Sequence, residues 1–336
     1  YGKLTLSNGK IFGNQFKDGN LYNKCTLESK KVFYVGTFKN YLMDGVGKIT
    51  CTNGEVYEGD FKNDKMHGKG KYIFEDGNIY EGEYRNGEKH GKGIFTHANG
   101  DFYEGDFKDG ERNGKGRLTW KCGSYYEGDW LDGIRHGKGK VVWANGATYK
   151  GDFRDDEQNG NGTYTYPSGC KYEGKFKNSH HHGFGKMIYP DGSLYEGEWK
   201  LSKENGTGIR TWSNGDFYKG NFEKGYFHGD GEMHYVANCR VTISDGNTSV
   251  VKTRGVYIGK WKFNKENGIG KRIWHKGDIY VGNWKDGKQN GKGKYTYANG
   301  DDYEGNFIKN KRHGRGKIIY NDGDVYEGYW VNDKRH

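Results

Sequence analysis

Proline is nearly absent from this 336-residue chain, which contains 2 prolines, and cysteine is scarce, with 5. The shortage of proline excludes collagen, and the many Tyr, Phe and Trp residues exclude a disordered chain. No apolar run approaches the roughly 18 residues of a membrane-spanning helix, and no signal peptide is visible. The cysteines form no Cys-x-x-Cys pair and are odd in number, which favours reduced thiols in a cytoplasmic protein. They are Cys25, Cys51, Cys122, Cys170 and Cys239.

Glycine and aromatic residues are abundant instead, with 59 glycines and an aromatic content of 16%. Rings spaced against glycine indicate an all-β protein. Lysine and arginine number 54 and aspartate and glutamate 44, which gives a net charge of +10, but both signs are interleaved throughout. We interpret this pattern as a solvated face of mixed charge. An anionic partner such as a phospholipid headgroup is the alternative.

A Tyr-x-Gly element recurs every 23 residues, with one interval of 39 residues between Tyr218 and Tyr257. Its tyrosines are Tyr34, Tyr57, Tyr80, Tyr103, Tyr126, Tyr149, Tyr172, Tyr195, Tyr218, Tyr257, Tyr280, Tyr303 and Tyr326. A fixed period of this length indicates an array in which each unit packs only against its neighbours. We therefore expect function to reside on a surface rather than in a pocket.

We expect one array over residues 1–336. Residues 1–33 hold degenerate or partial repeats, residues 34–235 are regular, residues 236–256 form an extended hairpin arm, and residues 257–336 are regular again with a truncated last repeat. Because both ends fall inside a repeat, we expect the chain to be a segment of a longer protein.

Side chains within a repeat alternate as they do in strands. Tyr57, Gly59 and Phe61 share one face of the first strand, and Gly68 and Gly70 belong to the second. Acidic and basic residues then face each other on the opposite side. The predicted fold is all-β, an elongated, single-layer, twisted antiparallel meander of about 13 or 14 stacked 23-residue hairpins, with one extended hairpin arm. The repeat signature includes Tyr57, Gly59, Phe61, Gly68, Gly70, Tyr80, Gly82, Tyr103, Gly105, Tyr126, Gly128, Trp130, Tyr195, Gly197, Trp199, Tyr280, Gly282 and Trp284.

Glycine within these strands is expected to leave a slot in which an aromatic ring of a neighbouring hairpin lies on bare backbone. Two connections complete each repeat. One is expected to be a loop of four to six residues, as at residues 63–67. The other contains x-Gly, as in Asp76-Gly77, and is expected to be a type I′ turn with positive φ at both central residues.

The long interval before Tyr257 keeps the strand alternation, with a turn signal at residues 244–247. We expect about eight extra residues on each strand, which form an arm that binds a partner because its apolar face has no neighbouring strand. A flexible loop is the alternative. The arm residues expected to make contacts are Tyr235, Cys239, Val241, Ile243 and Val251.

Histidines mostly occupy one column of the repeat, before glycine, where they interchange with asparagine. This favours a turn residue in the left-handed region over a metal ligand. Two groups that include column members are the exceptions and are candidates for a structural zinc, which needs nitrogen or sulfur ligands close together. They are His180, His181 and His182, and the group His228, His234 and Cys239. No other cofactor is expected.

Catalytic and nucleotide motifs are not found. The Gly-Lys-Gly-Lys phrases lack the strand-to-helix context of a phosphate loop, and the Gly-x-Gly pairs lack the helix of a dinucleotide site. No Ser-His-Asp or Cys-His arrangement recurs outside the repeat. The glycine slots account for the rings that might otherwise stack on nucleic acid. We expect neither an enzyme nor a nucleic-acid partner.

The phrase that runs from Tyr103-Glu104-Gly105-Asp106-Phe107 to Asn113-Gly114-Lys115-Gly116 closely resembles the MORN (membrane occupation and recognition nexus) repeat. The resemblance covers nearly the whole chain. It implies scaffold or linker proteins of cytoskeletal, junctional and ciliary structures, regulatory segments of lipid kinases and other enzymes, and binding of membrane phospholipid.

Together these observations predict a non-enzymatic protein–protein interaction scaffold of a cytoskeletal, ciliary or membrane-peripheral assembly in the cytoplasm. We expect it to form a homodimer or serve as an assembly subunit, and to bind helical or extended protein segments on its aromatic face or arm. The alternatives are a peripheral adaptor for anionic phospholipid and a regulatory segment of a larger enzyme such as a lipid kinase.

Overall fold

The computed structural model describes residues 2–7, 10–14, 16–17, 20–21, 25–29, 31–242 and 248–336; for residues 2, 14, 16–17, 20–21, 237–242 and 248–254 it describes the backbone only. Two units, Tyr1–Pro167 and Ser168–His336, are distinguished by their internal contacts, and each is considered by itself. The described residues of both units form strands and turns. None of them belongs to a helix that could span a membrane.

The first unit is a sheet whose strands pair antiparallel. Strand β1 pairs with β2, β2 with β5, and each later strand with the next, while β3 and β4 pair separately. Its strands are β1 (Gly2–Thr5), β2 (Ile11–Asn14), β3 (Phe16–Lys17), β4 (Asn20–Leu21), β5 (Cys25–Glu28), β6 (Val32–Lys39), β7 (Leu42–Cys51), β8 (Val56–Lys62), β9 (Lys65–Ile73), β10 (Ile79–Arg85), β11 (Glu88–Thr96), β12 (Phe102–Lys108), β13 (Glu111–Thr119), β14 (Tyr125–Leu131), β15 (Ile134–Val142), β16 (Thr148–Arg154) and β17 (Glu157–Thr165).

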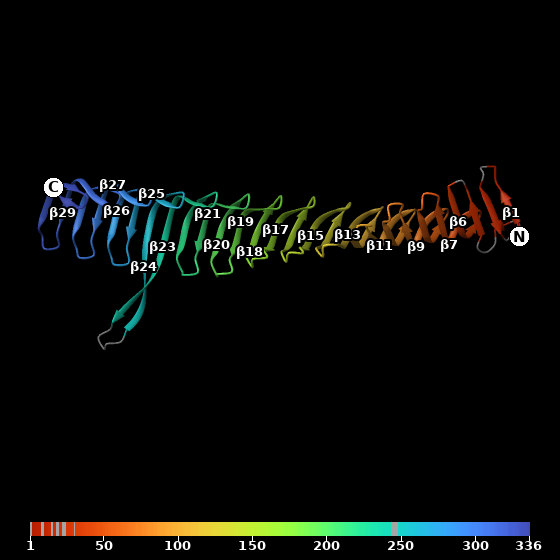
Figure 1. Ribbon diagram of the computed structural model, residues 1–336, viewed down its shortest axis with the longest axis horizontal. Coiled ribbons are helices and arrows are strands. Elements are labelled where there is room, and N and C mark those ends of the chain that lie inside the picture. The colour runs from red at the N-terminus through yellow and green to blue at the C-terminus, as the bar shows by residue number, and fades with distance from the viewer. Residues whose placement is uncertain are drawn as a thin grey trace. The chain divides into compact units, whose positions relative to one another are not determined.

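The second unit continues the same pattern, and each of its strands pairs antiparallel with the next in chain order. Its strands are β18 (Lys171–Lys177), β19 (His180–Ile188), β20 (Leu194–Lys200), β21 (Lys203–Thr211), β22 (Phe217–Glu223), β23 (Tyr226–Thr242), β24 (Thr248–Lys262), β25 (Lys265–Ile273), β26 (Ile279–Lys285), β27 (Lys288–Thr296), β28 (Asp302–Ile308), β29 (Lys311–Ile319), β30 (Val325–Val331) and β31 (Lys334–Arg335). Figure 1 shows this succession within each unit. The all-β antiparallel meander of hairpin repeats is therefore confirmed.

Glycines stand opposite one another on successive strands, so that Gly59 pairs with Gly70 and Gly70 with Gly82. The ring of Tyr57 covers the first of these pairs: a Cβ atom built on Gly70 would lie 2.5 Å from the Cε2 atom of Tyr57. A methyl group cannot be accommodated there, which explains why glycine is needed. The expectation that the ring lies on a neighbouring hairpin is wrong, because both glycines belong to the tyrosine's own repeat.

The tyrosine hydroxyl also closes a local irregularity in the ladder. The register shifts between Gly59 and Phe61, where Asp60 is skipped. The hydroxyl of Tyr57 donates a hydrogen bond to the carbonyl oxygen of Asp60, 2.8 Å away. The same bond recurs in the other repeats, as from Tyr280 to Asn283 at 3.0 Å. Each tyrosine therefore satisfies a carbonyl group at the point where the strand pairing is interrupted.

Neighbouring repeats are joined by the aromatic residue four positions after the tyrosine. The ring of Tyr84 lies edge-on to Tyr80 of its own repeat, with centroids 5.1 Å apart, and to Tyr57 of the preceding repeat, at 5.2 Å. Trp284 repeats this arrangement between Tyr280 and Tyr257, at 5.2 and 5.3 Å. Edge-to-face rings at these separations attract one another. The core is thus a continuous line of rings on one face of each unit.

Both turn types predicted from the sequence are wrong. The connection expected to be a loop of four to six residues is a two-residue turn, and the connection expected to be a type I′ turn is of another type. Strands β8 and β9 leave only Asn63 and Asp64 between them, and both have positive φ, 48° and 65°, as in a type I′ turn. At the other connection, Gly77 has positive φ and Asp76 does not. Gly77 donates its N–H to the carbonyl of Phe74, which is the geometry of a type I turn followed by a glycine bulge.

The arm is the part of β23 and β24 in which each strand pairs only with the other. Strand β22 pairs with β23 as far as His234, and β25 pairs with β24 from Val256 onward. Beyond these points, residues 235–242 and 248–255 pair only with each other. Figure 1 shows the two strands extending past the edge of their neighbours. The turn expected at residues 244–247 lies outside the described residues.

Candidate interaction surfaces

All of the signature tyrosines except Tyr326 are core residues and cannot contact a partner. Twelve of them are less than 2% exposed, namely Tyr34, Tyr57, Tyr80, Tyr103, Tyr126, Tyr149, Tyr172, Tyr195, Tyr218, Tyr257, Tyr280 and Tyr303. Phe61, Trp130, Trp199 and Trp284 are also buried. Burial raises the pKa of the hydroxyl groups of Tyr80 and Tyr280, among others. The signature rings therefore fill the core, so partner segments expected on the aromatic face would have to contact other side chains there.

A second row of rings on the same face is only half-buried, and sequence reasoning missed it. We call it the outer aromatic row: Phe74, His97, Trp120, Trp143, Tyr166, Tyr189, Trp212, Tyr235, Trp274, Tyr297 and Tyr320. Each member lies 17 residues after a signature tyrosine, a spacing that could have revealed it. The rings contact their neighbours, as Tyr72 contacts Phe74 at 4.5 Å and Tyr164 contacts Tyr166 at 4.5 Å. This row is the accessible part of the aromatic face.

The opposite face bears charged residues in cross-strand pairs, as expected from the sequence. In the first unit Lys71 pairs with Glu81 at 3.7 Å and Lys92 with Asp106 at 2.6 Å. The side chains of Lys71 and Glu81 are 50% and 68% exposed, so each such pair contributes little to stability. The ladder nevertheless neutralises this part of the face.

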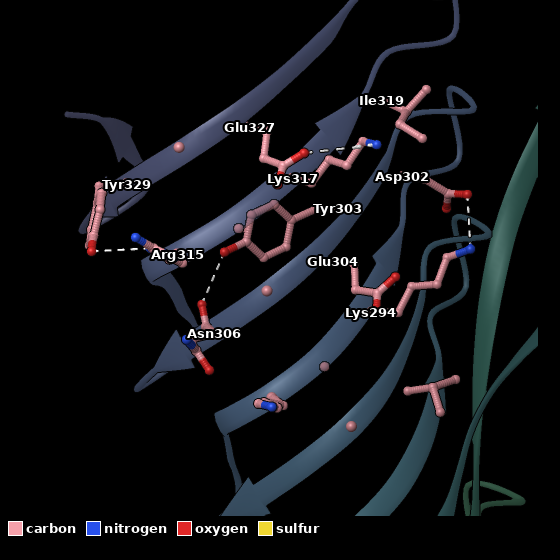
Figure 2. Close-up of a pocket in the computed structure, with 17 residues that line it drawn as sticks. Lys294, Asp302, Tyr303, Glu304, Asn306, Arg315, Lys317, Ile319, Glu327 and Tyr329 are labelled. Carbon is pink, nitrogen blue, oxygen red and sulfur yellow. Dashed lines mark hydrogen bonds and ion pairs between the residues drawn. The ribbon is translucent and has the colours of Figure 1, made fainter.

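A hollow of about 920 Å³ lies on the charged face of the second unit, across strands β26 to β30. Four bases line it, Lys292, Lys294, Arg315 and Lys317, together with three carboxylates, Asp302, Glu304 and Glu327, and uncharged residues such as Tyr329. Figure 2 shows Lys317 directed towards Glu327, Lys294 towards Asp302, and Arg315 towards Tyr329. Sequence reasoning missed this hollow because it treated the charged face as the same in every repeat.

The predicted arm residues fall in different places. Tyr235 lies at the base of the arm in the outer aromatic row, where the guanidinium of Arg272 lies 4.4 Å from its ring centroid. Burial raises the pKa of Tyr235. Cys239 and Val241 are on β23 and Val251 is on β24, within the paired part of the arm. Ile243 lies outside the described residues.

The histidine candidates for zinc do not come together. His181 is buried and stacks on Tyr172 at 3.6 Å, whereas His180 and His182 point to the other face, because neighbouring strand residues alternate. His234 stacks on Phe217 at 4.2 Å, and His228 lies 3.5 Å from Glu223. The side chain of Cys239 is not among those described. No group of three potential ligands is close enough to hold a metal in the part of the chain that the structure describes.

The histidine column also lies in strands rather than in turns. His67 is the third residue of β9, and the following Gly68 has the positive φ, 59°. The left-handed position thus belongs to the glycine. The histidine or asparagine before it occupies an extended position where the register shifts.

Comparison with known proteins agrees with this architecture. The model of the MORN repeat family matches residues 34–56, 57–79, 80–102, 103–125, 126–148, 149–171, 172–194, 195–217, 218–240, 257–279, 280–302, 303–325 and 326–336. The chain belongs to the MORN repeat family. A search of curated proteins found no match.

Solved structures with some similarity include the TCP domain of SAS-4 (dCPAP) from Drosophila melanogaster, in complex with a proline-rich motif of Ana2. It has 12% identity and a TM-score of 0.27, and the match covers 61% of this chain and 88% of that one. The G-box domain of the microcephaly protein CPAP has 11% identity and a TM-score of 0.15, with 85% and 100% covered. Virginiamycin B lyase from Staphylococcus aureus has 12% identity and a TM-score of 0.14, with 90% and 89% covered. Similarities this low carry no functional argument.

Proposed function

We propose that this chain is a non-catalytic scaffold that holds protein partners together and associates with a second copy of itself through the arm. The observation that carries this proposal is the pairing of residues 235–242 with residues 248–255 and, among the described residues, with no third strand. The outer edges of this ribbon present backbone N–H and C=O groups to solvent. Such edges pair readily with a further strand.

Membership of the MORN repeat family supports a role in protein or membrane interaction. The tyrosines of each repeat are buried in its core and its charged residues pair with one another, so these residues have structural roles. This favours a scaffold over an enzyme. We further propose that the scaffold works in the cytoplasm, in a cytoskeletal, ciliary or membrane-peripheral assembly. In that setting the outer aromatic row provides the surface for helical or extended segments of partner proteins.

The test is a variant in which the arm is removed and the 23-residue period is restored at that point. In the preceding repeat Trp212 is followed by Ser213-Asn214-Gly215-Asp216, and Phe217 and Tyr218 then begin the next repeat. Replacing residues 236–255 with Ser-Asn-Gly-Asp joins Tyr235 to Val256 by the same turn. Light scattering after size exclusion should give the wild-type chain twice the 38.4 kDa of one copy and the variant the mass of a monomer.

The matched control is Ala98→Ser, which gives the regular turn at residues 98–101 the same four residues without touching the arm. This variant should remain dimeric. Identical masses for the wild-type chain and the armless variant would contradict the role of the arm. Sedimentation of both chains with phosphatidylserine vesicles at low salt, lost at high salt, would instead favour the phospholipid adaptor.

A further inference from the structure

The charged face differs between the two units at matched positions. The residues of each repeat that face this side include those at 1, 3, 12 and 14 positions after the tyrosine. In residues 57–125 they comprise six carboxylates and five bases: Glu58, Asp60, Glu81, Glu83, Glu104, Asp106, Lys69, Lys71, Lys92, Lys115 and Arg117. In residues 257–325 they comprise one carboxylate and six bases: Glu304, Lys260, Lys271, Lys292, Lys294, Arg315 and Lys317. At these positions the second block has more bases than acids, although Asp302, one position before Tyr303, adds a further carboxylate on this face.

The lost acids are those that neutralise the bases elsewhere. Asp106 accepts the backbone N–H of Lys115 at 2.9 Å and pairs with the ammonium of Lys92 at 2.6 Å. Asn283 and Asn306 occupy the position of Asp106 in the second block. An asparagine can hold the backbone, as the amide of Asn283 does by donating to the carbonyl of Lys292 at 3.1 Å. It cannot balance a neighbouring charge.

Three of the six bases of the second block have a carboxylate partner and three do not. Lys260 pairs with Asp230 at 2.7 Å, Lys294 with Asp302 at 3.1 Å, and Lys317 with Glu327 at 4.0 Å. Lys271, Lys292 and Arg315 form no ion pair with any residue that the structure describes. Lys292 and Arg315 line the hollow, and Lys271 lies beside it, opposite Val281. Bases grouped in this way attract an anionic partner more strongly than scattered ones, because their fields add.

The spacing of the bases indicates an extended chain as the anion. Lys271, Lys294 and Lys317 lie on β25, β27 and β29, which are alternate strands. Strands about 4.8 Å apart place these lysines roughly 9.6 Å from one another. A chain in the polyproline II conformation advances about 3.1 Å per residue and presents every third side chain on the same side, roughly 9.3 Å apart. A carboxylate at every third residue therefore matches this row.

Apolar side chains lie between the bases and suit a peptide better than a free anion. Val281 stands opposite Lys271 and is 46% exposed, and Ile269 is 71% exposed. Tyr329, at the far end of the hollow, is 52% exposed. A peptide can cover these groups with the residues between its carboxylates. A planar membrane surface reaches less easily into a hollow.

We propose that the hollow lined by residues 281–329, together with the adjoining Lys271, docks an extended acidic segment of a partner protein, with a carboxylate at every third residue. The proposal rests on the role of the chain as a scaffold but uses a surface other than the arm. Fluorescence anisotropy of a fluorescein-labelled peptide of four Asp-Pro-Pro triplets tests it. Binding should weaken with added salt, and a peptide with Asn in place of Asp should not bind.

The decisive variant is Asn283→Asp with Asn306→Asp, which restores the acids of the first unit without changing side-chain size. We expect its affinity for the peptide to fall at least tenfold, while circular dichroism and oligomeric mass stay as in the wild-type chain. The control, Asn99→Asp with Asn145→Asp, adds the same charge at turn positions where Asp76 and Asp191 occur naturally. It should bind as the wild-type chain does.

Three outcomes would overturn the proposal or part of it. Equal affinity for the wild-type chain and the Asn283→Asp, Asn306→Asp variant would exclude the hollow as the site. Equal affinity for a peptide of the same composition with its four Asp residues adjacent would overturn the third-residue spacing. Binding of phosphatidylserine vesicles or oligothymidine that depends on Asn283 and Asn306, without peptide binding, would assign the hollow to another polyanion. The armless variant should still bind the peptide, so failure of the arm hypothesis remains distinguishable.

Discussion

The indole N–H of Trp199 donates a hydrogen bond to the carbonyl oxygen of Gly185, 3.0 Å away, across the boundary between two repeats. Trp130, Trp261, Trp284 and Trp330 make the equivalent bond in their repeats. Where phenylalanine or tyrosine occupies this position, only the edge-to-face ring contact remains. Because a repeat array is stabilised by its nearest-neighbour interfaces, these tryptophans mark the boundaries that hold most firmly.

Trp199→Phe should lower the urea midpoint of unfolding. It keeps a ring between Tyr172 and Tyr195 but leaves the carbonyl of Gly185 without its donor, at a cost of about 1 to 3 kcal/mol. Trp212→Phe makes the same change in the outer aromatic row, where the indole N–H has no hydrogen bond within the described residues. It should cost less than half as much. Equal shifts for the two variants would show that ring size, not the hydrogen bond, sets the effect.

Gly82→Ala should destabilise the first unit strongly. A Cβ atom at this position would lie 2.5 Å from the Cα atom of Gly93 and 2.6 Å from the hydroxyl oxygen of Tyr80. Neither the backbone nor a ring buried among others can move away, so we expect a loss of about 2 to 4 kcal/mol. Glu81→Ala, on the exposed face of the same strand, should stay within about 0.5 kcal/mol of the wild-type chain. Urea unfolding followed by circular dichroism measures both.

The repeat period predicts much of this fold, and there are physical reasons for what it does not predict. The 23-residue spacing and the two-residue alternation define the hairpins, the buried ring face and the extra length of β23 and β24. The turn types could not be predicted from Asp76-Gly77 alone, because one positive φ or two depends on how many residues separate the strands. The hollow was missed for another reason. Asn283 also hydrogen-bonds to the backbone, as a donor to the carbonyl of Lys292 where Asp106 accepts an N–H, so the effect of the substitution appears in the ion pairs of its neighbours.

The buried tyrosines predict a steep alkaline transition. Burial raises the pKa of residues such as Tyr57, Tyr103 and Tyr218 above the ordinary value near 10. The folded chain therefore holds protons that the unfolded chain releases, so this contribution to stability is present below pH 10 and is lost as the pH rises above it. Absorbance at 295 nm should rise in one step together with the loss of the circular dichroism signal. In 8 M urea the rise should be gradual and centred near pH 10. Gradual ionisation of the folded chain would contradict this.

From the burial of His181 we predict that the folded chain loses stability at acidic pH. Burial against Tyr172 and Trp199 lowers its pKa to about 4, with a smaller effect from His180, while an unfolded histidine titrates near 6.5. Between these values the unfolded chain binds the additional proton, so stability is complete above pH 6.5 and falls as the pH is lowered towards 4.

This histidine alone should lower the stability of the second unit by about 2 kcal/mol between pH 7 and pH 5. His181→Gln supplies the control, because Gln289 is buried at the same position of another repeat and carries no charge at any pH. Thermal unfolding at both pH values should show a smaller difference for the variant than for the wild-type chain. If the wild-type chain and the variant lose the same stability between the two pH values, a group other than His181 causes the loss. His181 is then as accessible to water in the folded chain as in the unfolded one.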